Sequence, residues 1–326
     1  TAEYIDSTGA TVVEKTRTGL PSNGTHEFLA SGSGLPDGWQ GAMLLSSTEV
    51  VASVATIHWN GGVTAGDDGD NGQYAGESAG STTVYCPALY QNTFLYSTIA
   101  IQNTGTSDAS VQVALRDRNG VAYGGNPVTK TIKPNAQATI NFSTEPNYFA
   151  ATGKDGSAVI TSNQPVAVVA TTHWNGRNSA YNCPTTGATT LYVPTQYRVT
   201  SDGGTFSAYT LYSANVLMNL SSSATANVTF HYIPRNPANP TLDVPVTIPP
   251  LSAKGLNTYN GGSVEASTFN ALGNLWDGTV VVQSDQPLVG INNTLWGPTS
   301  GERSATFKIL TAADGANAVY LPHAHR

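Results

Sequence analysis

The feature that most constrains the fold of this 326-residue chain is an internal repeat. The segment 41–61, which ends in His-Trp-Asn-Gly, recurs without a gap as residues 156–176, 115 positions further on. A third copy spans residues 278–296 and lies 122 positions after the second. Repeats of this length are too long for the units of a solenoid and fit whole domains.

Two shorter motifs recur with the long one. A Tyr-x-Pro motif follows each copy, at residues 85–87, 192–194 and 320–322. An apolar residue shortly before a proline marks a turn at residues 132–134 and 248–250, and in a shorter form at residues 20–21. The Tyr-x-Pro motifs are 107 and 128 residues apart, which sets the length of one unit.

Each unit has the pattern of short strands. Between the first Tyr-x-Pro and the second His-Trp, segments alternate with a period of two or are continuously apolar, at residues 97–101, 111–115, 128–132, 136–142, 157–161 and 166–172. Turn signals such as Asn119-Gly120 separate them, and no window has a helical period. The 33 Gly, the 18 Pro and the many Thr, Ser, Asn and Val residues favour strands and turns. About seven strands per unit are typical of an immunoglobulin-like β-sandwich.

We therefore predict an all-β protein of about three tandem immunoglobulin-like sandwiches, one of them split between the two termini. Residues 1–80 form a partial sandwich and residues 81–185 a complete one. Residues 186–316 form a second complete sandwich, with a proline-rich insertion at 233–250 that suits edge strands or loops. Residues 317–326, called the tail below, form a strand that completes the split sandwich of the same or of the next subunit.

Composition and motifs exclude several functional classes. Only 11% of the residues are charged, the net charge is −7 and no Lys/Arg cluster exists, which argues against a nucleic-acid partner. The sequence contains no run of 18 apolar residues, so it predicts no membrane-spanning helix. The chain lacks Gly-x-Ser-x-Gly, His-Glu-x-x-His and cysteine pairs at metal spacing, and its six histidines are scattered. We expect no enzymatic activity and no cofactor.

The Tyr-x-Pro motif occurs together with Ser-Thr-Ile-Ala-Ile-Gln-Asn-Thr-Gly at residues 97–105 and Gly-Ser-Ala-Val-Ile-Thr-Ser-Asn-Gln-Pro-Val-Ala-Val-Val at 156–169. This combination resembles tandem sandwich modules of secreted prokaryotic surface proteins and is similar to adhesin-like repeats of extracellular appendages. The resemblance covers nearly the whole chain. It implies a fold and a location outside the cell or at its surface, but no activity, because fold alone is a poor guide to function.

The two cysteines flank the first complete unit. Cys86 lies in the first Tyr-x-Pro motif and Cys183 nine residues before Tyr192. A disulfide between them would tie the entrance of the unit to its exit and suits an extracellular protein. Two unpaired buried thiols are the alternative.

Carbohydrate and calcium define further candidate residues. Asn-x-Ser/Thr sequons, the acceptors of N-linked glycans, occur at Asn23, Asn141, Asn219, Asn227 and Asn292. Asp67, Asp68 and Asp70 lie in one Gly-rich acidic loop, where carboxylates at close spacing suit Ca²⁺. An ordinary solvated turn is the alternative for that loop, because neither flanking helices nor a terminal Glu at the required distance is present.

The repeated tryptophans have two interpretations. Trp59, Trp174 and Trp296 end the three copies of the long repeat and are candidates for stacking on a glycan. The alternative is a structural aromatic at a strand end. The third copy has Leu295 where the others have histidine, which argues against a catalytic His-Trp pair.

The tail has the strongest functional implication. Val319, Tyr320, Leu321 and Pro322 form a strand start without the rest of its sandwich, and an open strand edge recruits a strand from elsewhere. We predict a structural subunit that assembles head-to-tail with copies of itself into an extracellular filament or surface layer. A glycan-binding adhesin module is the main alternative, and an accessory region of an enzyme is another. Closure of the two ends within one chain, as a ring of three sandwiches, also stays open.

Overall fold

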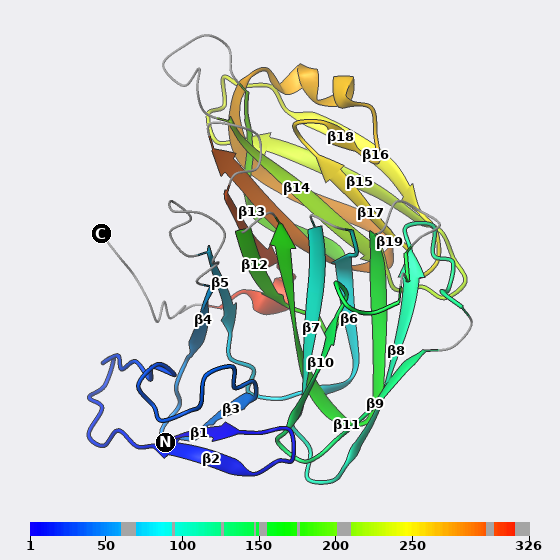
Figure 1. Cartoon of the computed structure of the whole chain (residues 1–326). Helices are drawn as coiled ribbons and strands as arrows, with labels where there is room; N and C mark the ends of the chain where they lie inside the picture. The colour runs from blue at the N-terminus through cyan, green and yellow to red at the C-terminus, as the bar shows by residue number, and fades with distance from the viewer. Residues whose placement is uncertain are drawn as a thin grey trace.

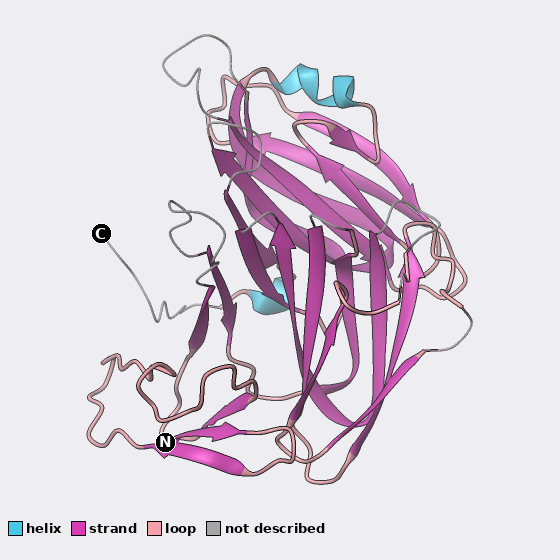
Figure 2. Cartoon of the chain, in the orientation of Figure 1, coloured by secondary structure: helices cyan, strands magenta, loops and turns pink. Residues whose placement is uncertain are grey.

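The computed structural model is an all-β protein of antiparallel sheets (Figure 2). The described residues are 1–59, 70–92, 95–124, 127–146, 148–149, 155–174, 177–200, 210–297 and 303–316. Among these residues, helical structure is confined to the short 3-10 helices η2 (Ala266–Leu272) and η3 (Ala312–Asp314).

The middle of the chain folds into a complete sandwich, called the middle sandwich below. Its strands are β6 (Ser81–Tyr90), β7 (Leu95–Asn103), β8 (Ala109–Asp117), β9 (Val128–Ile132), β10 (Gln137–Asn141), β11 (Asp155–Trp174) and β12 (Arg177–Asn182) (Figure 1). The segments predicted from alternation at 97–101, 111–115 and 128–132 lie within β7, β8 and β9.

The long strand β11 belongs to both layers of this sandwich. Its first half pairs with β6 and β8, and its second half pairs with β7 and β12. The pairing register breaks between Thr161 and Val166, where Pro165 has no N–H to donate to a ladder. The strand order is therefore β9-β8-β11-β6 in one layer and β10-β7-β11-β12 in the other. The immunoglobulin arrangement instead divides its strands between two sheets without a shared strand.

The sequence predicts two strands at 157–161 and 166–172, and the structure joins them into one. The residues between them keep an extended backbone through the register break instead of forming a turn. Alternation cannot distinguish these cases, because it describes which face each side chain takes and not whether the chain reverses.

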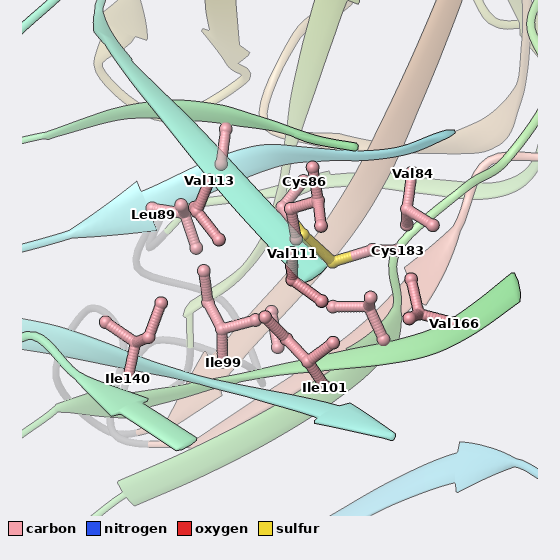
Figure 3. Packing of buried hydrophobic residues seen from close by; sticks show 14 of the residues in the cluster. Val84, Cys86, Leu89, Ile99, Ile101, Val111, Val113, Ile140, Val166 and Cys183 are labelled. Atoms are coloured by element: carbon pink, nitrogen blue, oxygen red, sulfur yellow. A yellow bond between two sulfur atoms is a disulfide. The ribbon is translucent and has the colours of Figure 1, made fainter. Parts of the chain in front are cut away.

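Side chains from both layers meet in a single core (Figure 3). Ile99 and Ile101 of β7 and Val111 and Val113 of β8 are fully buried. Their neighbours along each strand are exposed or half-buried, as the two-residue period of a strand requires. The alternation in the sequence therefore reports the inward face of each layer.

A third sandwich repeats this plan. Its strands are β13 (Ala188–Val199), β14 (Thr210–Asn219), β15 (Ala226–Pro234), β16 (Leu242–Ile248), β17 (Ala253–Asn257), β18 (Gly261–Gly262), β19 (Leu275–Gly297) and β20 (Arg303–Lys308). The long strand β19 pairs with β13 and β15, then with β14 and β20. β16, from the proline-rich insertion, lies at a sheet edge, where Pro245 does not interrupt a central ladder.

The two sandwiches agree residue by residue in their pairing. Tyr85 of β6 pairs with Val159 of β11. Tyr192 of β13 pairs with Val281 of β19, which is the residue 122 positions after Val159. The repeat that is visible in the sequence is thus a repeat of backbone register, so equivalent positions can be compared directly.

The N-terminal unit, residues 1–80, contains two small separate sheets (blue in Figure 1). One has the order β2-β1-β3, with β1 (Ala2–Ile5), β2 (Thr11–Lys15) and β3 (Ala42–Leu45). The other is the hairpin of β4 (Val54–Trp59) and β5 (Asp70–Ala75). By the 115-residue offset, β3 corresponds to the first half of β11 and β4 to its second half.

Candidate functional site

Two positions that belong to the core of the complete sandwiches are exposed in the N-terminal unit, although Ala2 and Tyr4 of β1 are buried as their equivalents are. Met43 of β3 is 40% exposed, whereas Ala158, its equivalent in the middle sandwich, is fully buried. Val51 is 43% exposed, whereas its equivalents Val166 and Leu288 are fully buried. Apolar side chains that stabilise two sandwiches therefore face solvent in the first unit.

The exposure follows from two absent neighbours. The first half of β11 lies between β8 and β6, but β3, its equivalent, pairs only with β1 among the described residues. The second half of β11 lies between β7 and β12, but β4 pairs only with β5 in the described part of the chain. Within the described part of the chain, each strand thus presents a free edge of backbone N–H and C=O groups, which is a template for pairing with another chain.

A third segment of the N-terminal unit, residues 24–29, also lacks the partner strand that its equivalent has. In the middle sandwich β10 pairs with β7 alone. Residues 24–29 follow the first proline turn as β10 follows the second, and no strand forms there. Leu29 is 59% exposed. A segment whose only partner would be a β7-like strand stays irregular when that strand is not supplied.

The free edge of β3 is equivalent to the edge of β11 that pairs with β6, so it would accept a strand like β6. In both complete sandwiches the residues on either side of the motif tyrosine point into the core: Val84 and Cys86 in β6, and Leu191 and Val193 in β13. All four are at most 1% exposed, whereas Tyr192 is 42% exposed. The inward positions of such a strand therefore need apolar side chains, and the tyrosine lies on the opposite face of the strand.

The predicted assembly residues lie in the tail, outside the described residues. Aligned on the motif, Val319 takes the position of Val84 and Leu321 that of Cys86. Both positions therefore carry apolar residues in the tail, as the equivalent inward positions do in β6.

Sequence reasoning missed one residue of this site, Gly315. Each motif tyrosine has a glycine five positions before it: Gly80, Gly187 and Gly315. A β-carbon on Gly80 would lie 2.7 Å from backbone atoms of Val166, and one on Gly187 would lie 2.9 Å from the carbonyl of Leu288. Within its own chain Gly315 has no such neighbour among the described residues, since a β-carbon there would meet only the carbonyl of Ala312, at 3.3 Å. The spacing alone could have revealed it.

Cys86 and Cys183 form a disulfide that closes the middle sandwich (Figure 3). Their Cα atoms are 4.9 Å apart, and 97 residues separate them in sequence. Both sulfurs are buried in the core. The third sandwich has Val193 and Ile309 at the equivalent positions, both buried, so an apolar contact replaces the covalent bond there.

The structure corrects the prediction of five glycosylation candidates. Asn219 and Asn292 are fully buried, and their side-chain amides donate to neighbours inside the sandwich. A glycan cannot be carried on a buried amide, so these two are structural. Asn141 is half-buried, whereas Asn23 and Asn227 are exposed. The Asn227 amide already donates to Asp285, with an N–O distance of 2.7 Å.

The buried asparagines have a structural role that the sequence did not show. The Asn219 amide donates to the carbonyls of Ala224 and Ile248, at 2.8 and 3.0 Å. In the middle sandwich Asn103 donates to Ser107 and Ile132 in the same way, at 2.8 and 2.9 Å. Each amide thereby holds the turn that follows its own strand against the end of a later strand. The buried carbonyls at both places need a hydrogen-bond donor, which the amide supplies.

The tryptophan positions favour a structural interpretation in the described part of the chain. Trp174 and Trp296 lie near the ends of β11 and β19 and are half-buried. The side chain of Trp59 lies outside the description. Next to Trp174, the His173 ring stacks on Tyr96 with 4.7 Å between centroids. Burial lowers the pKa of His173, and a hydrogen bond with Asn178 opposes that shift.

Metal, membrane and ligand sites find no support in the described residues. No group of three or more His, Cys, Asp or Glu side chains is placed to hold a metal there. Asp67, Asp68 and the side chain of Asp70 lie outside the description. The helices of the described chain are too short and too polar to cross a bilayer. Burial raises the pKa of Tyr181 and Tyr232, and both tyrosines lie in sandwich cores.

Comparison with known proteins does not assign the chain to a family. No family model matches the chain, and no curated protein matches it. Among solved structures, it is similar to the Anabaena sensory rhodopsin transducer over 28% of its own length and 97% of that chain, with 24% identity and a TM-score of 0.23. A TM-score this low does not establish a shared fold.

Proposed function

We propose that the protein is a structural subunit of an extracellular filament or surface layer, which assembles head-to-tail by strand complementation. The observation that carries the proposal is the exposed inner face of β3, where Met43 is 40% exposed and its equivalents Ala158 and Val280 are at most 1% exposed. A strand from a second copy would cover this face and satisfy the free edge.

The tail of the neighbouring copy is the donor. Its motif places Val319 and Leu321 at the two inward positions that apolar residues hold in β6 and β13. The tail is long enough for one strand of the length of β6, which has ten residues. Gly315 adds a third matching position, since glycine precedes both complete strands at the same spacing.

Donation between subunits is favoured over closure within one chain. Bringing both ends of three rigid sandwiches together would require specific linkers at each junction. A contact between different surfaces of successive copies that does not close generates a filament. The disulfide of the middle sandwich agrees with an oxidising location outside the cytosol.

The experiment compares two substitutions in the tail that introduce the same charge. Leu321→Asp places it at an inward position, and we expect this variant to abolish polymer that is visible by negative-stain electron microscopy. Asn317→Asp places it at a position whose equivalents, Thr82 and Thr189, are exposed, and we expect normal filaments. Both variants should keep the melting temperature of the monomer. If wild-type protein forms no polymer, or if Leu321→Asp assembles as wild type does, the proposal is wrong.

A further inference from the structure

Three turns at equivalent places in the three units share one hydrogen-bonding pattern, which the turn Asn141–Thr144 also has. In the turns Asp6–Gly9, Asp117–Gly120 and Asn236–Asn239, the first side chain accepts from the backbone N–H two residues later, at 2.8, 2.8 and 3.1 Å. The fourth N–H donates to the first carbonyl, at 3.1, 3.0 and 2.9 Å. Each turn joins a pair of equivalent strands: β1–β2, β8–β9 and β15–β16.

The first two of these turns contact the following sandwich in the same way. A β-carbon on Gly9 would lie 2.8 Å from the carbonyl oxygen of Pro134, which belongs to the proline turn of the middle sandwich. A β-carbon on Gly120 would lie 2.6 Å from the carbonyl oxygen of Pro250, in the proline turn of the third sandwich. One sandwich-to-sandwich contact is therefore made twice within the chain.

Other parts of the junction repeat as well. β5 lies beside β12 (Figure 1), and β12 contacts β20. Ten residues separate the end of each last strand from the next motif tyrosine, from Ala75 to Tyr85 and from Asn182 to Tyr192. The spacing from Lys308 to Tyr320 is twelve. The first and middle units are therefore arranged in space as the middle and third units are, and this arrangement of successive units is called the step below.

We propose that this step continues across the subunit boundary, so that the turn Asn236–Asn239 of one copy docks on residues 21–24 of the next copy. The inference rests on the proposed function. Residues 21–24 have the backbone of the two contacted proline turns. Gly24 N–H donates to the Pro21 carbonyl at 2.9 Å and Asn23 has φ 60°, as Ala136 N–H donates to Lys133 at 3.1 Å and Asn135 has φ 62°.

In the described part of the chain, the surfaces around the two turns that we propose to meet are exposed. In the middle sandwich Tyr85 and Val159 pack against Met218 and Val289 of the third sandwich. Their counterpart on the third sandwich, Tyr192, is 42% exposed. Residues 21–23 and 236–238 are also exposed. In the polymer, the next copy would cover Tyr192 of the third sandwich, as the third sandwich covers Tyr85 of the middle one.

The third turn differs from the other two at one position. Asn239 takes the place of Gly9 and Gly120, so its side chain prevents an equally close approach. This turn also starts two residues later relative to the long strand: Asp117 pairs with Gly156, whereas Pro234, two residues before Asn236, pairs with the equivalent Gly278. The turn therefore extends farther from its sheet. A wider contact, in which the Asn239 amide donates to the Ser22 carbonyl, is compatible with both changes.

Cross-linking within the polymer tests the contact. Ser22→Cys and Ala238→Cys are combined in one chain, the polymer is treated with a short bis-maleimide, and the products are separated on a denaturing gel. The matched control combines Ala238→Cys with Ser7→Cys, because Ser7 is an equally exposed serine on the Asp6–Gly9 turn. We expect a ladder of covalent multimers from the first pair and at most a few percent dimer from the control.

The outcomes separate this inference from the proposed function. Normal filaments without a ladder would overturn the contact and leave strand complementation standing. A cross-linked monomer would show closure within one chain and overturn the contact between copies. No filament from the wild-type chain would reject the proposed function, and the contact with it.

Discussion

Met43 and Ala158 occupy the same position of two equivalent strands, yet Met43 is 40% exposed and Ala158 is fully buried. The strands do not differ in their pairing on one side: Met43 pairs with Tyr4 of β1 as Ala158 pairs with Leu115 of β8. They differ on the other side, where Ala158 pairs with Cys86 of β6. The β6-like neighbour therefore contributes to the difference in burial.

The first prediction concerns Gly315. We expect Gly315→Ala to change the thermal stability of the single chain little, because among the described residues a β-carbon there meets only the carbonyl of Ala312, at 3.3 Å. In a polymer the same β-carbon would meet the backbone at Val51, which is equivalent to Val166, the residue that a β-carbon on Gly80 would meet. Filament yield, measured by sedimentation, should therefore fall.

Gly187→Ala is the matched control for this variant. We expect it to destabilise the single chain by about 1 to 3 kcal/mol, the usual cost of overpacking, because Leu288 O would lie 2.9 Å from the new carbon. Unimpaired assembly of Gly315→Ala would show that this glycine does not enter a packed junction.

The second prediction concerns the disulfide. Reduction, or Cys86→Ser with Cys183→Ser, should destabilise the middle sandwich by about 4 to 5 kcal/mol, the chain-entropy value for a loop of 97 residues. Cys86→Val with Cys183→Ile copies the buried pair Val193 and Ile309 of the third sandwich and should recover part of that loss. Urea denaturation measures both. Equal stability of the two double variants would contradict the role assigned to this core position.

The third prediction concerns backbone strain in the proline turns. Asn23, Asn135 and Leu251 occupy the same turn position with φ of 60°, 62° and 52°. Asparagine tolerates the left-handed region better than leucine does. Leu251→Asn should therefore stabilise the chain by about 0.5 to 1 kcal/mol, and Asn135→Leu should destabilise it by a similar amount. Thermal unfolding of the two variants checks the opposite signs.

The fourth prediction is a pH dependence at His173. Burial depresses the pKa of His173 in the folded chain, so the unfolded chain binds a proton more readily. The stability contributed by the neutral ring is complete above the unfolded value near 6.5 and is lost as the pH falls below it. His173→Gln should reduce the loss of stability between pH 7 and pH 5. An identical pH profile in the variant and the wild type would refute this assignment.

The all-β class and the main strand positions could be predicted from the sequence because strand alternation is a local property. Val111, Val113 and Leu115 alternate in the sequence and line one face in the structure. The union of two predicted strands in β11 could not be predicted, because it depends on β6 and β7 pairing with different halves of one strand.

The candidate site was only partly accessible to sequence reasoning. The incomplete unit could be inferred from motif spacing, but the exposed inner face at Met43 and Val51 required the three-dimensional equivalence with Ala158 and Val166. The burial of Asn219 and Asn292 was equally invisible, because a sequon specifies residue types and not the face of the strand.

The most direct test of strand complementation is a register-specific cross-link between copies. Leu321 of one copy should pair with Met43 of the next, as Cys86 pairs with Ala158. Met43→Cys combined with Leu321→Cys is polymerised, oxidised and separated on a non-reducing denaturing gel, with each single variant as control. The account predicts a ladder of disulfide-linked multimers from the double variant alone. Filaments that run only as monomers on that gel would contradict it.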